Sequence, residues 1–89
     1  MKKKLKYKLK DEILFLIHEF RKNYDFYVSH GRLNSEGKKL QSQIIKKFFF
    51  FTNDKYILKF IKKDDEHDLA KMIYYIEKVL EESFLFVER

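Results

Sequence analysis

The choice of fold depends on residues 48–61, which read FFFFTNDKYILKFI. Asn53 and Asp54 separate two apolar runs, and a short polar break of this kind is a signal for a β-hairpin. Aromatic and β-branched residues are also enriched in strands. We therefore predict antiparallel strands over residues 42–52 and 55–62, with Asn53 and Asp54 as the turn between them.

A helix over residues 38–51 is the alternative interpretation of the same region. Ser35 is a suitable N-cap for such a helix. Apolar residues then recur at steps of three and four, at Leu40, Ile44, Phe48 and Phe51. The hairpin signal that follows favours the strand, and the strand is the interpretation adopted here.

Two further strands are indicated upstream. Residues 25–30 are rich in strand-forming side chains, and the turn that follows places Gly37 where a positive φ is useful. In residues 3–10, lysine alternates with Leu5, Tyr7 and Leu9, which is the period of a strand. Lysine is common on protected edge strands, so we predict a short edge strand there. A disordered basic tail or an extension of the next helix are the alternatives.

Helices are predicted on both sides of these strands. The first covers residues 11–24, with Asp11 as N-cap, and Leu14 and Phe15 widen its apolar face so that it should be buried on more than one side. The second covers residues 64–86, with Asp65 as N-cap. Its apolar stripe consists of Leu69, Met72, Ile73, Ile76, Leu80 and Phe84.

These elements predict a single α+β domain over residues 1–89, with an edge strand or tail at 1–10 and a β-meander at 25–62. The fold is a three-stranded antiparallel meander packed against two helices, in the order α-β-β-β-α, with residues 1–10 as a fourth, edge strand. This order is similar to the double-stranded RNA-binding domain over about residues 11–84. That family has lysines at the start of its last helix, where this chain has acidic residues at 64–66 and 68.

Charge is distributed unevenly along the chain, whose formal net charge is +6. Residues 1–63 hold seventeen Lys or Arg against six Asp or Glu, and residues 64–89 hold three against eight. Such asymmetry is typical of proteins that bind nucleic acid or another polyanion. The alternative is that a lysine-rich surface keeps a small aromatic protein in solution.

The predicted hairpin brings lysines and aromatic rings to one face of the sheet. An open face of this composition suits single-stranded nucleic acid, because bases stack on rings and lysines meet phosphates. The alternative is that the N-terminal strand or a second copy of the chain covers this face. The predicted nucleic-acid-binding residues are Lys4, Lys6, Lys8, Lys38, Lys46, Phe48, Phe50, Lys55 and Lys59.

We find no catalytic, metal-binding or cofactor motif in the chain. Cysteine is absent, and His18 lacks the second histidine of a zinc-protease motif. The acidic residues around His67 are explained by a helix N-terminus, and His30 is a lone loop histidine. Near the start, the longest apolar run is residues 13–17, which is too short for a signal peptide or a membrane span.

The sequence therefore predicts a cytoplasmic, non-enzymatic, nucleic-acid-binding accessory protein, of the kind that phages and plasmids carry. It would act by phosphate neutralisation and aromatic stacking. The alternative is a protein–protein interaction module, either an inhibitor that binds an acidic protein or a homo-oligomeric adaptor such as a homodimer.

Overall fold

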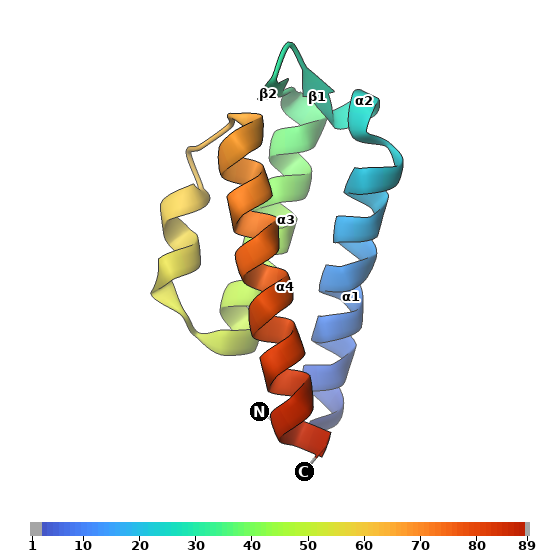
Figure 1. Ribbon diagram of the computed structural model, residues 1–89, viewed down its shortest axis with the longest axis vertical. Coiled ribbons are helices and arrows are strands. Elements are labelled where there is room, and N and C mark those ends of the chain that lie inside the picture. The colour runs from blue at the N-terminus through green and yellow to red at the C-terminus, as the bar shows by residue number, and fades with distance from the viewer. Residues whose placement is uncertain (1–2, 89) are drawn as a thin grey trace.

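A computed structural model describes the backbone of residues 3–88 and the side chains of residues 7–82. Three long helices lie along its longest axis: α1 (Lys3–Lys22), α3 (Ser35–Thr52) and α4 (Glu66–Glu88) (Figure 1). The colour ramp shows that α3 and α4 run in one direction and α1 in the other. A 3₁₀ helix, η1 (Lys55–Phe60), leads the chain back beside α3 and α4.

The core lies between the three long helices and η1. Each helix contributes one stripe of apolar side chains, and the largest fully buried ones are Phe48, Phe60, Ile13, Ile17, Ile44, Ile57, Met72, Ile76 and Leu80. Burial of such stripes, rather than local propensity, supplies most of the stability of helices in a small domain.

A short hairpin closes one end of the bundle. After α2 (Tyr24–Tyr27), strands β1 (Val28–Ser29) and β2 (Arg32–Leu33) pair antiparallel. His30 and Gly31 between them have φ values of 54° and 79°. Positive φ at both central residues is the requirement of a type I′ turn, which suits two-residue hairpins.

Backbone hydrogen bonds tie this hairpin to the start of α4. The amide of Leu33 donates to the carbonyl of Asp64 at 2.8 Å, and the amide of Glu66 donates to the carbonyl of Gly31 at 2.9 Å. The side-chain oxygen of Asp65 accepts from the amide of His67 at 2.8 Å and so caps the helix start, as the sequence predicts.

The predicted three-stranded meander is wrong. Residues 42–52 belong to α3, residues 55–60 form η1, and only Val28 and Ser29 of the predicted strand at 25–30 are in a strand. The predicted order α-β-β-β-α therefore does not hold. The similarity to the double-stranded RNA-binding domain rested on this order and does not hold either. The described part of the chain contains one two-stranded sheet and is otherwise built from helices.

The predicted hairpin turn is in fact a junction between two helices. Asn53 has a φ of 59°, and its amide donates to the carbonyl of Phe49 at 2.7 Å, which is a left-handed helix C-cap. The side chain of Asp54 accepts from the amide of Tyr56 at 2.9 Å and begins η1. In η1 the buried residues, Ile57 and Phe60, are three apart, which is the period of a 3₁₀ helix.

The first helix begins earlier than predicted. Because α1 starts at Lys3, residues 3–10 are helical and do not form an edge strand, and the extension of the first helix is the correct alternative. Asp11 lies in the middle of α1 with an exposed side chain and is not an N-cap. None of the described helices combines the length and apolar character needed to cross a membrane.

Gly37 lies in the first turn of α3 and not in a loop with positive φ. Its amide donates to the side-chain oxygen of Asn34, the N-cap of α3, at 2.9 Å. A Cβ atom at this position would collide with the backbone carbonyl oxygen of Tyr27. Glycine is therefore required here for the close approach of two backbone segments.

Candidate functional site

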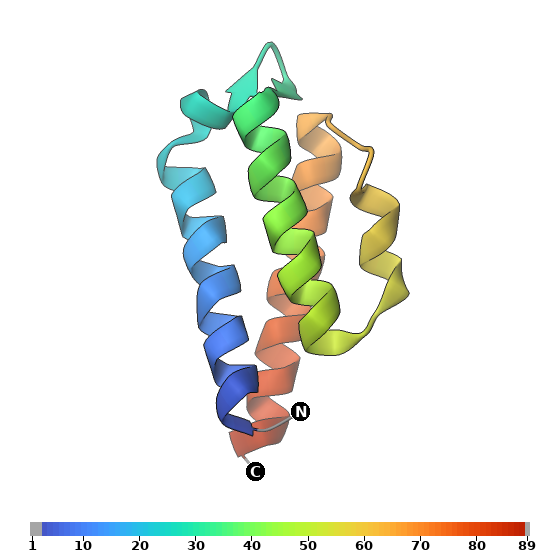
Figure 2. The same cartoon turned by 180° about the vertical axis from the view of Figure 1, so that it is seen from behind.

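The structure separates the charges of the chain onto different sides of the bundle. Residues 37–63 carry eight lysines against one acidic residue, Asp54, whereas α4 carries six acidic residues against two lysines. Figure 1 shows α4 at the front, and Figure 2 shows α3 at the front with η1 beside it. We call the exposed lysines of this second side the basic face: Lys38, Lys39, Lys46, Lys55, Lys59, Lys62 and Lys63.

Several lysines of the basic face carry charges that no described carboxylate neutralises. Lys39 lies 3.5 Å from Glu36, and Lys38 lies 3.8 Å from Asp64. Within the described part of the chain, Lys46, Lys55 and Lys62 form no ion pair. An anionic partner could therefore form ion pairs with these three ammonium groups without breaking an existing ion pair.

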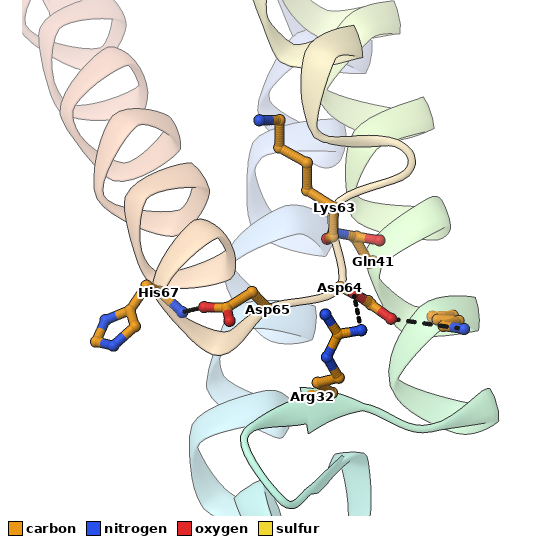
Figure 3. A network of polar contacts seen from close by, with 7 residues as sticks. Arg32, Gln41, Lys63, Asp64, Asp65 and His67 are labelled. Carbon is orange, nitrogen blue, oxygen red and sulfur yellow. Dashed lines mark hydrogen bonds and ion pairs between the residues drawn. The ribbon is translucent and has the colours of Figure 1, made fainter.

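The polar cluster at the hairpin end stabilises the link between η1 and α4 (Figure 3). Arg32 of β2 lies 3.5 Å from Asp64, which also pairs with Lys38. The buried side chain of Gln41 donates to the carbonyl of Lys63 at 2.7 Å. Since Asp64 offsets both Arg32 and Lys38, this end of the molecule offers less free positive charge than Lys46 and Lys55 do.

An aromatic cluster fixes the start of η1. The ring centroids of Tyr56 and Tyr75 are 4.6 Å apart, and the ammonium group of Lys59 lies 4.2 Å from the centroid of Tyr56. The hydroxyl of Tyr75 donates to the carboxylate of Asp54. This hydrogen bond, with burial, raises the pKa of Tyr75 to about 12. The ring of Tyr56 contacts Tyr75 and Lys59 and is still 45% exposed.

We expect Tyr75→Phe to destabilise the fold by about 1 kcal/mol, because it removes a hydrogen bond to a carboxylate. The folded pKa of about 12 lies above the ordinary value of 10.0, so this stabilisation is complete below pH 10.0 and is lost as pH rises through about 12. Urea unfolding and near-ultraviolet titration of phenolate measure the two effects. Tyr74→Phe, at an exposed tyrosine of α4, is the control, and an equal loss in both variants would contradict the assignment.

The structure places the sequence-predicted site residues in different environments. Phe48 is 0% exposed and belongs to the core, so its predicted role as a stacking surface is wrong. Phe50 is 61% exposed, because residues two apart on a helix point in different directions. Lys4 and Lys6 belong to α1, but their side chains lie outside the described part of the chain. The other predicted lysines are exposed: Lys8 on α1, Lys38 and Lys46 on α3, and Lys55 and Lys59 on η1.

One feature of the surface is absent from the sequence prediction, namely a groove between α1 and α3. Its volume is about 600 Å³, and Phe15 of α1, which is 61% exposed, lines it. The signal for this groove in the sequence is the wider apolar face of α1 at Leu14 and Phe15. Both side chains are exposed, so the prediction that this width is buried on more than one side is wrong.

In the described part of the chain, no three His, Asp or Glu side chains come together in a way that would hold a metal ion. Comparison of the chain with protein-family models, with curated proteins and with solved structures found no match.

Proposed function

We propose that this chain is a small nucleic-acid-binding accessory protein that acts in the cytoplasm and lays the phosphate backbone along its basic face. The observation that carries the proposal is the charge of Lys46, Lys55 and Lys62, which pair with no carboxylate among the described side chains, in a segment with a single acidic residue. Clustered lysines bind phosphates by releasing counterions, and this contribution supplies most of the affinity in non-specific binding.

The composition of the basic face favours phosphate contacts over reading of base edges. Lysine supplies every cation of this face, and the nearest arginine, Arg32, is paired with Asp64. Arginine is the residue that best makes two parallel hydrogen bonds to a guanine edge, whereas lysine acts as a point charge. We therefore expect affinity to depend strongly on salt and weakly on base sequence.

The charge of the basic face can be tested by comparing two matched double variants. Lys46→Gln/Lys62→Gln and Lys71→Gln/Lys78→Gln both lower the formal net charge by two, but the second pair lies on the exposed side of α4. We expect the first pair to weaken binding of labelled DNA or RNA about tenfold and to lower the log–log salt slope by about 2. The second pair should remain within about twofold of wild type. Fluorescence anisotropy at several salt concentrations measures both.

Two outcomes would contradict the proposal. An equal loss of affinity in the two double variants would mean that net charge alone matters and that the basic face is not a site. A flat anisotropy curve for the wild-type protein near physiological salt would mean that it has no nucleic-acid partner of useful affinity.

An acidic protein is the second candidate partner for the same face. The exposed side chains of Leu58 and Ile61 lie among the lysines of η1 and its following turn, and apolar side chains of this kind contribute to protein interfaces. This candidate predicts the flat nucleic-acid titration just described. In that case the lysine pair Lys46 and Lys62 remains the pair to substitute in binding assays with acidic proteins.

A further inference from the structure

A pocket of about 280 Å³ lies on the basic face, between α3 and the turn that joins η1 to α4. The residues that line it are Lys38, Gln41, Ser42, Ile61, Lys62 and Asp64. Its volume is just below the usual range of ligand sites, which is about 300–1,000 Å³. The pocket therefore has room for a small charged group and not for a helix, a strand or a base pair.

Hydrogen bonds hold the two walls of this pocket in place. Lys38 and Ser42 lie four residues apart on α3 and therefore on the same side of the helix. The buried side chain of Gln41 donates to the carbonyl of Lys63 at 2.7 Å and fixes the opposite wall against α3 (Figure 3). The following carbonyl accepts from a backbone amide of β2 at 2.8 Å. The pocket is thus formed before a ligand arrives, which lowers the entropic cost of binding.

The charges around the pocket do not cancel. Arg32 and Lys38 lie 3.5 Å and 3.8 Å from the carboxylate of Asp64, so two cations share one anion. Lys62, on the opposite wall, forms no ion pair within the described residues. Three cations against one carboxylate leave a local net charge of +2. An anion that binds between Lys38 and Lys62 leaves Asp64 its shorter contact, with Arg32, so this carboxylate does not have to be displaced.

A phosphate monoester is the anion that matches these groups best. It carries a charge of about −1.5 to −2 at pH 7 and three terminal oxygens that accept hydrogen bonds. The pocket offers three kinds of donor to them, namely the ammonium groups of Lys38 and Lys62 and the hydroxyl of Ser42. A carboxylate or an internal phosphodiester has a single charge and two free oxygens. The strand on both sides of a phosphodiester also keeps it at the mouth of so small a pocket.

We propose that this pocket binds a phosphate monoester at the end of a nucleic-acid strand. This inference rests on the proposed function and adds to it that the partner is held by a phosphorylated end. Lys46 lies four residues beyond Ser42 on the same side of α3, so a strand that begins in the pocket can continue along the basic face. Ile61, which is 50% exposed, lines the pocket and would contact the sugar of the first nucleotide.

The experiment titrates the full chain into an internally labelled single-stranded DNA of about 12 nucleotides, with a phosphate at the 5′ end, at the 3′ end or at neither end. We expect one phosphorylated end to be bound at least about tenfold more tightly than the unphosphorylated strand near physiological salt, because it adds charge-assisted hydrogen bonds. The readout is this ratio of affinities, since attraction to the internal phosphates acts on all three probes alike.

Substitutions at two adjacent lysines of α3 locate the site. Lys38→Gln removes a cation of the pocket, whereas Lys39→Gln removes one outside it that pairs with Glu36. We expect Lys38→Gln to reduce the preference from about tenfold to about twofold. Lys39→Gln should weaken binding of all three probes equally and keep the preference. Ser42→Ala removes a donor without a change in charge and should reduce the preference about threefold. Circular dichroism verifies that all variants are folded.

The possible results separate this inference from the proposed function. Equal affinity of the wild type for the three probes would overturn the inference and leave the basic face as a site for internal phosphates. A preference that Lys38→Gln and Lys39→Gln reduce equally would show that the pocket is not the site. If the wild type binds none of the probes near physiological salt, the proposed function fails and this inference fails with it.

Adenosine 5′-monophosphate tests the other source of a phosphate monoester. We expect it to compete with the phosphorylated strand only in large excess, because it lacks the internal phosphates that the basic face would contact. If it binds as tightly as the phosphorylated strand does, the ligand of the pocket is a small phosphate ester, and the assignment to a strand end is overturned.

Discussion

Phe48→Ala is expected to lower the free energy of unfolding by about 3–5 kcal/mol, the range typical of a large aromatic residue removed from a core. Phe48 is fully buried, and its ring lies edge-on to that of Tyr75 at a centroid distance of 6.1 Å. Small domains are stable by about 5–15 kcal/mol, so this variant should be partly unfolded at moderate temperature. Urea unfolding followed by circular dichroism measures the change.

Phe50→Ala is the matched control, and it also tests the fold. On α3, Phe48 points inward and Phe50 points outward, so the exposed substitution should change stability by no more than about 0.5 kcal/mol. In a β-strand, residues two apart share a face and the two substitutions would cost similar amounts. Equal costs would therefore contradict the helix and support the strand.

Gly37→Ala is expected to destabilise the protein by about 3 kcal/mol, the upper part of the range for added volume at a tightly packed position. The added Cβ would collide with the carbonyl oxygen of Tyr27, which accepts from the amide of Asn34 at 2.9 Å. The backbone would have to move, and the N-cap of α3 would move with it. The sign of this stability change is informative, because alanine in place of glycine ordinarily stabilises a helix by about 0.5–1 kcal/mol.

The control for this prediction is Ser42→Ala on the exposed side of the same helix. It should be neutral or slightly stabilising, because alanine has the higher helix propensity. Thermal unfolding of both variants measures the difference. A stabilised Gly37→Ala would mean that the start of α3 does not approach the segment of Tyr27 as closely as described.

The sequence locates the helices near both ends of the chain because their apolar stripes are long and regular. For the last helix the cap is also correct, since Asp65 accepts from the amide of His67. For the first helix the start is wrong, because lysines alternating with Leu5, Tyr7 and Leu9 have strand periodicity. Strand periodicity over so few residues does not outweigh continuation of a helix that buries Leu9 and Ile13.

The middle of the chain is wrongly predicted because its strongest signals have two meanings. An asparagine and an aspartate between apolar runs are typical of a hairpin, but asparagine also ends helices in a left-handed conformation and aspartate begins them. Here Asn53 ends α3 and Asp54 begins η1. The run of phenylalanines at 48–51 favours a strand by composition, yet that preference depends on packing against neighbours. The true hairpin turn is at His30 and Gly31, where the sequence offers only one glycine.

The candidate site was predictable in part. The lysine content predicts a basic surface whatever the fold is. Lys46, Lys55 and Lys59 are exposed although they lie in helices and not in the predicted strands. Which phenylalanine is exposed was not predictable, since the choice between Phe48 and Phe50 depends on whether the side-chain period is 2 or 3.6. Phe15 illustrates the same difficulty, because an apolar residue in a helical stripe is expected in the core.

The separation of charge between α3 and α4 has a kinetic consequence. A body with lysines on one side and carboxylates on the other has a large electric dipole in addition to its formal net charge of +6. In the field of a polyanion such a body rotates as it approaches, so that most collisions occur with the basic face in front. The association rate constant should therefore exceed that of an evenly charged protein of the same net charge, and the difference should disappear as added salt shortens the range of the field.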